Sequence, residues 1–218
     1  MSSGRAPRTA NEATVEKLDL KKQYRDLYLP SARECAVVDV PEFQFLMIDG
    51  HGDPNTSDEY REALEALYGM SYTLKFLSKQ TEEIDYVVMA LEGLWWTDDM
   101  ADFSEDDKSA WSWTSMIMQP SHLTKDHFKD AADQLRAKKN PMALDKMRFE
   151  SFHEGLSVQI MHIGPYAEEA PTISRLHQYA VDNGYRIRDK HHEIYLSDPR
   201  RAAPEKLRTV IRQPVEPV

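Results

Sequence analysis

The sequence predicts an α+β fold in which two β-α-β-β units pair about a pseudo-twofold axis and form an antiparallel sheet, with a ligand cleft between the halves. Two observations support this prediction. The order strand, helix, strand, strand occurs twice along the chain, and segments of the two halves resemble each other. Residues 115–120 (SMIMQP) resemble residues 209–214 (TVIRQP), and residues 47–50 (MIDG) resemble residues 161–164 (MHIG). Each unit is too small to bury a sheet alone, so we expect the two to share one core.

In the first half, turn and capping signals mark where the helix begins. The first long strand ends at the sequence GHGDP, which is typical of a turn. Thr56 followed by Glu59 matches a capping box, with Thr56 as the N-cap of an amphipathic helix. The elements expected in this half are a short helix at 16–29, an extended segment at 35–40, strands at 42–50, 85–96 and 111–120, and a helix at 57–79.

The second half follows a linker helix, for which Thr124 is the expected N-cap. Gly184 marks the expected end of the next helix, because glycine readily adopts the left-handed conformation that closes a helix. The elements expected here are the linker helix at 124–139, strands at 156–164, 185–196 and 207–214, and a helix at 168–183. The expected domains are an N-terminal tail with a short helix at 1–41 and one domain at 42–218, made of a first repeat at 42–120, a linker at 121–146 and a second repeat at 147–215.

Composition excludes several classes of function. The formal net charge is −10, whereas nucleic-acid binding generally needs a basic surface, so we expect no nucleic-acid partner. Cys35 is the single cysteine, which excludes a disulfide framework. No apolar run reaches the roughly 18 residues of a membrane span, and residues 1–12 lack the core of a signal peptide. We therefore expect a cytoplasmic protein without a membrane partner, disordered over about its first 15 residues, and the internal pseudo-dimer favours a monomer.

One predicted strand carries a carboxylate at its centre. Residues 191–199 (HHEIYLSDP) are typical of a strand closed by a turn. Alternation along this strand places Glu193 and Tyr195 on one face and His192 on the other. A carboxylate beside a phenol in mid-strand is unusual unless that face lines a cavity. The alternative is an exposed glutamate, or an ion pair with a neighbouring arginine.

Several segments resemble the GyrI-like small-molecule-binding family, and more narrowly its stand-alone cyclopropanoid cyclopropyl hydrolases. The segments that carry the resemblance are residues 45–55 (FLMIDGHGDPN), 91–96 (LEGLWW), 152–166 (FHEGLSVQIMHIGPY) and 190–201 (KHHEIYLSDPRR). The resemblance implies an SH2-like pseudo-twofold repeat, with the glutamate of the E-x-Y strand at the bottom of a ligand pocket. It also implies that an aromatic cage binds DNA-alkylating natural products of the yatakemycin and CC-1065 type, whose strained ring is opened without a cofactor.

The resemblance leaves three functions open. The matching segments favour hydrolytic opening of the cyclopropane ring, for xenobiotic detoxification. The alternative is a multidrug-binding protein that sequesters hydrophobic or cationic compounds without turnover, and a third is a protein-interaction role such as gyrase antagonism. On the first two interpretations the partners are hydrophobic aromatic small molecules, and DNA itself is not a partner.

Glu193 and Tyr195 are the expected catalytic residues. In the catalytic interpretation, Glu193 orients or deprotonates the water that opens the ring, and Tyr195 or Tyr166 donates a hydrogen bond to the ligand carbonyl. Tryptophans on two adjacent strands suggest a wall for flat ligands, although each could equally be ordinary core. Trp95 and Trp96, being neighbours, must point to opposite faces. The expected ligand-binding residues are Trp95, Trp96, Trp111, Trp113, Tyr166 and Glu92.

Glu92 belongs to this set as the possible repeat partner of Glu193, because their sequences EGLW and EIYL are alike. In a second alignment, which matches Thr97 with Ser197, Glu92 is no longer equivalent to Glu193. The role of Glu92 therefore stays open. Glu154, at the start of a predicted strand, is expected at the surface.

Metal and nucleophile chemistry are not expected. His191 and His192 project to opposite sides of one strand, so they cannot easily bind one ion, and the chain has no HExxH or CxxC motif. It also lacks the GxSxG elbow and the glycine-rich phosphate loops. We therefore expect no metal and no cofactor. The acidic loop at 97–107 is expected to be solvated, or to act as a flap over the cleft.

Overall fold

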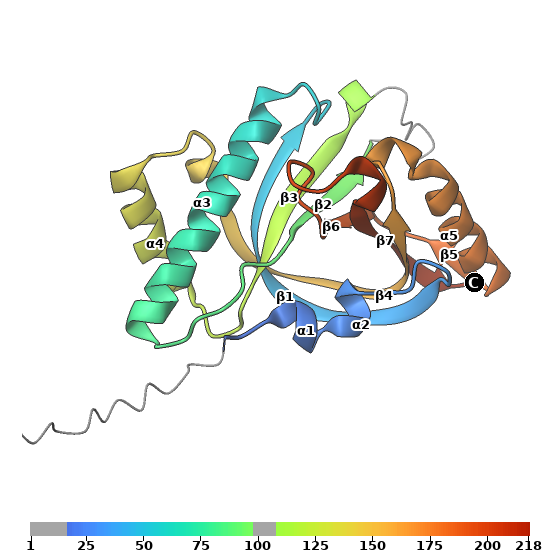
Figure 1. The fold of residues 1–218 in the computed structure, drawn as a ribbon, viewed down its shortest axis with the longest axis horizontal. Coiled ribbons are helices and arrows are strands. Elements are labelled where there is room, and N and C mark those ends of the chain that lie inside the picture. The colour runs from blue at the N-terminus through green and yellow to red at the C-terminus, as the bar shows by residue number, and fades with distance from the viewer. Residues whose placement is uncertain (1–16, 98–107) are drawn as a thin grey trace, which may run out of the picture.

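The computed structural model describes residues 17–97 and 108–218 and confirms a mixed α+β fold (Figure 1). The strands are β1 (Ala36–His51), β2 (Leu91–Trp96), β3 (Ser112–Gln119), β4 (Arg148–Ile163), β5 (Tyr185–Ile187), β6 (His191–Tyr195) and β7 (Arg208–Pro217). They form one sheet in the order β4-β1-β3-β2-β6-β7-β5, and all neighbours are antiparallel.

The sheet closes into a barrel-like arrangement because β4 pairs with β7 as well as with β1. Strands β1 and β4 are each 16 residues long, and their pairing runs from Ala36–Gln159 to Met47–Arg148. Only β5 lies outside the ring, beside β7. The strands of the ring therefore have neighbours on both sides, which protects their edges from pairing with another chain.

The two halves of the chain contribute strands in the same spatial order. β3 lies between β1 and β2, and β7 lies between β4 and β6. The halves meet through the β1–β4 and β2–β6 pairs. Such an order agrees with two β-α-β-β units but does not by itself establish a duplication. The duplicated unit and the domain boundaries at 1–41 and 42–218 stay predictions.

Five helices pack around the barrel in the described part of the chain. They are α1 (Leu20–Gln23), α2 (Arg25–Tyr28), α3 (Asp58–Thr81), α4 (Lys125–Lys138) and α5 (Ala170–Asp182), with short 3₁₀ turns at Lys108–Ala110, Leu144–Lys146, Tyr166–Glu168 and Pro204–Lys206. α3 packs on β1 and β3, α4 packs on α3, and α5 packs on β4 and β7 at the opposite side of the molecule (Figure 1). Across the described ranges, no helix combines the length and the low polarity needed to cross a membrane.

Several predicted boundaries differ from the structure. The helix expected at 16–29 is divided into α1 and α2, because Tyr24 leaves helical geometry with a ψ of 47°. The segments expected at 35–40 and 42–50 form the single strand β1. Pro41 does not interrupt it, because the pairing of β1 with β3 begins only at Gln44 and the register with β4 skips the proline.

Two predicted strands are shorter than expected. Only residues 91–96 of the strand expected at 85–96 join the sheet, while Tyr86 makes a single bridge with Leu18. The strand expected at 185–196 is divided into β5 and β6, because Asp189 has a left-handed φ of 53° between them.

Capping was predicted correctly at two of three helix ends. The N-cap of α3 is Ser57 and not Thr56, because the Ser57 hydroxyl accepts the hydrogen bond from the Tyr60 N–H at 3.2 Å. Thr124 is confirmed as the N-cap of α4. Gly184, with a φ of 76°, follows the end of α5 as expected.

The interior of the barrel contains a buried network of charges, here called the interior network. It consists of Tyr28, Glu92, Glu154, His192 and Arg212, none of which is more than 3% exposed. His192 lies between the two carboxylates, with Nε2 3.0 Å from Glu92 Oε2 and Nδ1 2.9 Å from Glu154 Oε1. Arg212 donates to the other oxygen of Glu154 at 3.0 Å, and the Tyr28 hydroxyl donates to Glu92 at 2.8 Å. The expectation that Glu154 lies at the surface is therefore wrong.

The interior network also attaches α2 to the barrel. Arg212 Nη2 donates to the backbone carbonyl of Leu27 at 2.7 Å. Its Nε donates to Gln159 Oε1 at 3.0 Å, and the Gln159 amide donates to the carbonyl of Asp26 at 2.6 Å. Together with the hydroxyl of Tyr28, these bonds hold the α2 segment against the barrel interior.

Two members of the network have strongly shifted pKa values. Burial disfavours the charged form of His192, but Glu154 and Glu92 outweigh this effect and raise its pKa from 6.5 to about 9. Burial likewise disfavours the charged form of Glu154, but His192 and Arg212 hold its pKa at about 2, below the usual 4.5. Both groups are therefore charged at neutral pH.

We expect the free energy of unfolding to fall as the pH rises from 6.5 through about 9, because the stabilisation from a raised pKa is complete below the unfolded value and is lost as folded His192 loses its proton. His192→Gln should abolish this decline and should lower the unfolding free energy near pH 6 by about 3–5 kcal/mol. His153→Gln, at an exposed position of β4, is the matched control. Urea unfolding across this pH range tests the prediction, and parallel pH curves for the wild type and His192→Gln would contradict it.

Gly50, near the end of β1, leaves room for Trp113. A Cβ at this position would lie 2.2 Å from the Trp113 ring, which is fully buried. We expect Gly50→Ala to lower the unfolding free energy by about 1–3 kcal/mol through overpacking. Gly69→Ala in α3 is the control, because its Cβ would meet Leu135 at an ordinary 3.5 Å, and it should be neutral or stabilising by up to about 1 kcal/mol. Equal losses in the two variants, measured by denaturant unfolding, would rule out the packing explanation.

Candidate active site

The outward face of β6 carries a carboxylate held by a chain of hydrogen bonds. As alternation predicts, His192 points into the barrel, whereas Glu193 and Tyr195 point to the helix-covered face. The Tyr195 hydroxyl donates to Glu193 Oε2 at 2.7 Å and accepts from the Trp95 indole N–H at 3.0 Å. His191 Nε2 lies 3.3 Å from the other oxygen of Glu193. The Glu193 side chain is 12% exposed, so it is largely but not completely shielded from solvent.

These contacts favour an ionised Glu193. Burial opposes ionisation, but the close contact with His191 and the hydrogen bond from Tyr195, with a smaller contribution from Lys108, outweigh it and hold the pKa of this carboxyl below its usual value. Burial and the neighbouring Glu193 together raise the pKa of Tyr195 well above its usual value. At neutral pH the pair is therefore a carboxylate and a neutral phenol, which suits a hydrogen-bond acceptor or a general base.

Aromatic rings surround this pair. The aromatic cluster consists of Tyr60, Trp95, Trp111, Trp113, Tyr166 and Tyr195. The centroid of Trp95 lies 5.4 Å from that of Trp111 and 5.9 Å from that of Tyr60. Tyr60 also meets Trp113 edge-on at 5.0 Å, and Tyr166 meets Tyr195 edge-on at 5.6 Å. The rings come from α3, β2, β3, β6 and the loops before β3 and α5, so the cluster depends on the complete fold.

A glycine opposite Glu193 makes this arrangement sterically possible. Gly93 on β2 pairs directly with Glu193 on β6. A Cβ at Gly93 would lie 2.7 Å from the indole nitrogen of Trp95. The missing side chain therefore lets the Trp95 ring lie across β2 and reach Tyr195.

The structure brings together six of the eight residues predicted for the site. They are Glu193, Tyr195, Trp95, Trp111, Trp113 and Tyr166. Trp113 is fully buried, Trp95 is 2% exposed and Trp111 is 4% exposed, so a ligand must first separate parts of the cluster. The exposed edges of the site belong to Glu193 and to the tyrosines.

The other two predicted residues lie elsewhere. Glu92 is 1% exposed inside the barrel, where Tyr28 and His192 satisfy its carboxylate. Trp96 also faces the interior side, with the Lys190 ammonium 3.3 Å from its ring centroid. The prediction that these two residues share a site with Glu193 is wrong, because each lies one residue out of phase with the outward positions of β2.

Sequence reasoning missed Tyr60 and His191 as members of the site. Tyr60 lies on the inward face of the amphipathic helix, a position that looks like ordinary core until the fold places it over Trp95. His191 is two residues from Glu193 and so shares its face, a signal that was present in the alternation pattern. The acidic loop proposed as a flap lies largely at 98–107, outside the described residues.

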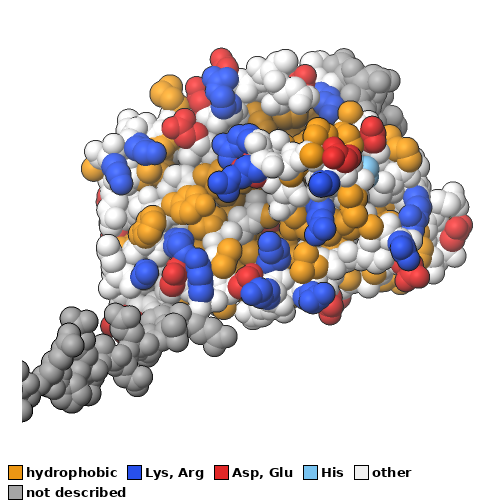
Figure 2. Space-filling model, in the orientation of Figure 1, with side chains coloured by type: hydrophobic (Ala, Val, Ile, Leu, Met, Phe, Trp, Pro, Cys, Tyr) orange, Lys and Arg blue, Asp and Glu red, His pale blue; other side chains and the backbone are white. Residues whose placement is uncertain are grey.

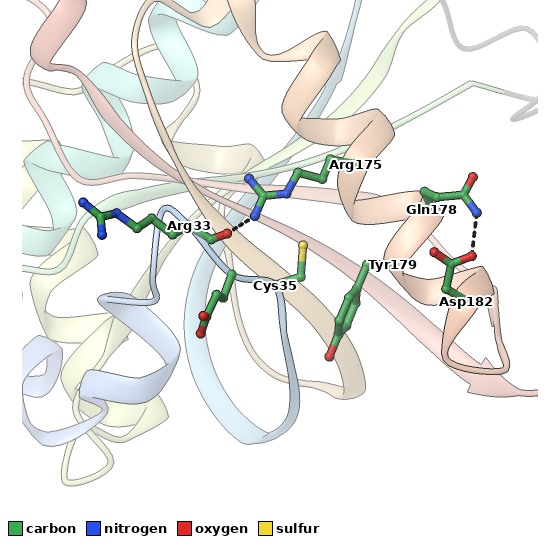
Figure 3. Close-up of a pocket in the computed structure, with 7 residues that line it drawn as sticks. Arg33, Cys35, Arg175, Gln178, Tyr179 and Asp182 are labelled. Carbon is green, nitrogen blue, oxygen red and sulfur yellow. Dashed lines mark hydrogen bonds between the residues drawn. The ribbon is translucent and has the colours of Figure 1, made fainter.

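Other features of the described chain do not extend the site. Across residues 17–97 and 108–218, no group of three or more His, Cys, Asp or Glu side chains could hold a metal ion. A hollow of about 580 Å³ lies between the segment before β1 and α5 (Figure 3). It is lined by Arg33, Glu34, Cys35, Arg175, Gln178, Tyr179 and Asp182. It shares no residue with the aromatic cluster, and Arg175 already donates to the backbone carbonyl of Arg33.

The surface near the site is rich in apolar groups. Hydrophobic side chains gather over α3 on the face shown in Figure 2. On α3 itself, Tyr68, Tyr72 and Phe76 are 38%, 50% and 56% exposed and recur every four residues along the helix. This row begins about two turns along α3 from Tyr60 of the aromatic cluster.

The model of the GyrI-like family, described as a GyrI-like small molecule binding domain, matches residues 33–216. The chain belongs to the GyrI-like family. Among solved structures, an uncharacterized conserved protein from Listeria innocua is 41% identical with a TM-score of 0.85, and the match covers 92% of this chain and 100% of that chain. A hydrolase encoded by lin2189 from Listeria innocua is 40% identical with a TM-score of 0.83 and the same coverage.

More distant solved structures share the fold alone. The C-terminal domain of EcmrR is 14% identical with a TM-score of 0.54, and the match covers 85% of this chain and 98% of that chain. The comparison with curated proteins found no match. The family therefore establishes small-molecule binding, while the particular ligand depends on the residues of the site.

Proposed function

We propose that this GyrI-like protein is a hydrolase that opens the cyclopropane ring of cyclopropanoid DNA-alkylating compounds. The observation that carries the proposal is the geometry of Glu193, which accepts a hydrogen bond from Tyr195 and is bordered by aromatic rings, while Trp95 donates in turn to Tyr195. Two solved structures that are 40% and 39% identical to this chain, and that it matches over their full length, are described as hydrolases. The biological effect would be that the cell is protected from a DNA alkylator, and the protein itself would not bind DNA.

The aromatic cluster supplies the binding energy in this proposal. A flat polycyclic ligand stacks on indole and phenol rings with favourable dispersion and quadrupole interactions. Trp95 and Trp111 already lie 5.4 Å apart at an interplanar angle of 59°, so a ligand must rotate or separate them to enter. The apolar surface formed by Tyr68, Tyr72 and Phe76 gives such a ligand a place to approach.

The chemical step needs only positioning and a base. The oxygen of a water forms a bond to the ring methylene, the ring C–C bond breaks, and its electron pair passes to the conjugated ligand carbonyl, which becomes a phenolate. Glu193 takes the proton of the attacking water. Strain in the ring provides much of the driving force, so alignment of the water contributes most of what the protein must add.

Tyr166 is the better donor to the developing phenolate. The Tyr195 hydroxyl already donates to Glu193. Burial, with the nearby carboxylates Glu169 and Glu193, raises the pKa of Tyr166 to about 12, so its hydroxyl keeps its proton at neutral pH. Its ring lies 5.6 Å from that of Tyr195, at the edge of the same cluster.

Binding without turnover is the second candidate, and the description of the family as a small-molecule binding domain favours it. The same rings and carboxylate would then sequester a hydrophobic or cationic compound. The two functions differ only in whether the ligand gains a water and in whether Glu193 matters more to rate than to affinity.

We expect Glu193→Gln to abolish ring opening while leaving binding within about tenfold of the wild type, because the amide keeps the shape of the side chain but cannot accept a proton. Mass spectrometry of a cyclopropanoid alkylator incubated with the protein follows the gain of one water. Glu42→Gln, on an exposed position of β1, is the matched control. Wild-type rates in Glu193→Gln would refute the catalytic role, and tight binding of unchanged ligand by the wild type would favour sequestration.

Tyr195→Phe tests how Glu193 is kept ionised. The hydroxyl of Tyr195 favours the carboxylate, so its removal should raise the pKa of Glu193. The acid limb of the pH–rate profile should then move to higher pH, with a lower rate at every pH because the carboxylate is less well oriented. Tyr185→Phe, on the short strand β5, is the control. An unchanged acid limb in Tyr195→Phe would show that another group sets it.

A further inference from the structure

A second hollow lies on the barrel side of the sheet. It has a volume of about 410 Å³, within the range of small-molecule sites. Its lining comes from five strands and the turn between β5 and β6, and includes Met47, Leu94, Trp96, Phe152, Arg148 and Lys190. It is separate from the candidate active site, because Leu94 and Trp96 point inward where Trp95 points outward.

The charges around this hollow are paired with one exception. Arg148 pairs with Asp49, and Arg188 pairs with Asp189. Inside the barrel, His192 and Arg212 form ion pairs with Glu154 and neutralise its charge. Lys190, by contrast, forms no ion pair with any carboxylate among the residues that the structure describes.

Lys190 occupies the aromatic surface of the hollow. Its ammonium lies 3.3 Å from the centroid of Trp96, the position in which a ring binds a cation. A cationic ligand would have to displace it. Burial lowers the pKa of Lys190, and Asp49 and Asp189 offset this only in part. An anion placed beside Lys190 would therefore gain a charge-assisted contact and relieve the cost of burying that ammonium.

We propose that this hollow is a binding site for a small organic anion with a flat apolar body. Its carboxylate or sulfonate pairs with Lys190, with Arg148 and Arg188 close by, while its apolar body lies against Met47, Leu94 and Phe152. The proposal concerns binding only and is independent of the ring-opening activity proposed for the opposite face.

Calorimetric titration with 2-naphthoate tests the proposal, with the cation 2-naphthylmethylammonium as the matched probe. The wild type, Lys190→Arg and Glu193→Gln should each bind one equivalent of the anion, and Lys190→Gln should bind it about tenfold more weakly or worse. Lys206→Gln, an exposed lysine outside the hollow, is the control and should bind as the wild type does. The cation should not bind at this site.

A second measurement needs no variant that could fail to fold. In NMR spectra of the wild type, 2-naphthoate should shift the indole N–H resonance of Trp96 and leave that of Trp95 in place. Shifts confined to Trp95 and Trp111 would put the anion at the aromatic cluster and overturn the proposal. Absence of binding, or equal binding by Lys190→Gln and the wild type, would also overturn it.

Discussion

The buried ion pairs inside the barrel are the interaction on which the rest of the structure depends. His192 and Arg212 each contact Glu154, and His192 also contacts Glu92. These four side chains come from β2, β4, β6 and β7, so the pairs join strands far apart in the sequence. Burying four charges is costly, and only their mutual neutralisation with complete hydrogen bonding makes it tolerable. The network therefore specifies how these strands meet more than it adds to the net stability.

The same network positions the candidate active site through the backbone of β6. His192 and Glu193 are adjacent, so a side chain locked inside the barrel fixes the direction in which the next one points. Opposite them, Gly93 leaves space for the Trp95 ring, whose N–H completes the chain to Tyr195 and Glu193. The residues that point into the barrel thus fix the positions of the strands, and the residues that point outward form the candidate active site.

Much of the site could be predicted from the sequence because period-two alternation is a local rule. It placed Glu193 and Tyr195 together, separated Trp95 from Trp96 and divided His191 from His192. It could not decide the role of Glu92, because that depends on register between strands. If residues 115–120 match residues 209–214, the observed β2–β3 and β6–β7 pairings make Glu92 equivalent to Ile194, one position from Glu193.

The remaining errors also have long-range causes. Glu154 seemed exposed by its place at the start of a short predicted strand, but β4 begins earlier, at Arg148, and the barrel closes over it. The partners that bury it, His192 and Arg212, are 38 and 58 residues away. Closure through β4 and β7 has no local signature, since it results from the curvature of the whole sheet.

The most direct test of the account is a crystal structure of Glu193→Gln with an intact cyclopropanoid bound. We expect the ligand among the rings of the aromatic cluster, with its cyclopropane methylene facing the side chain of residue 193 and its carbonyl toward Tyr166. A ligand found in the barrel-side hollow, or bound with its three-membered ring turned away from residue 193, would contradict it.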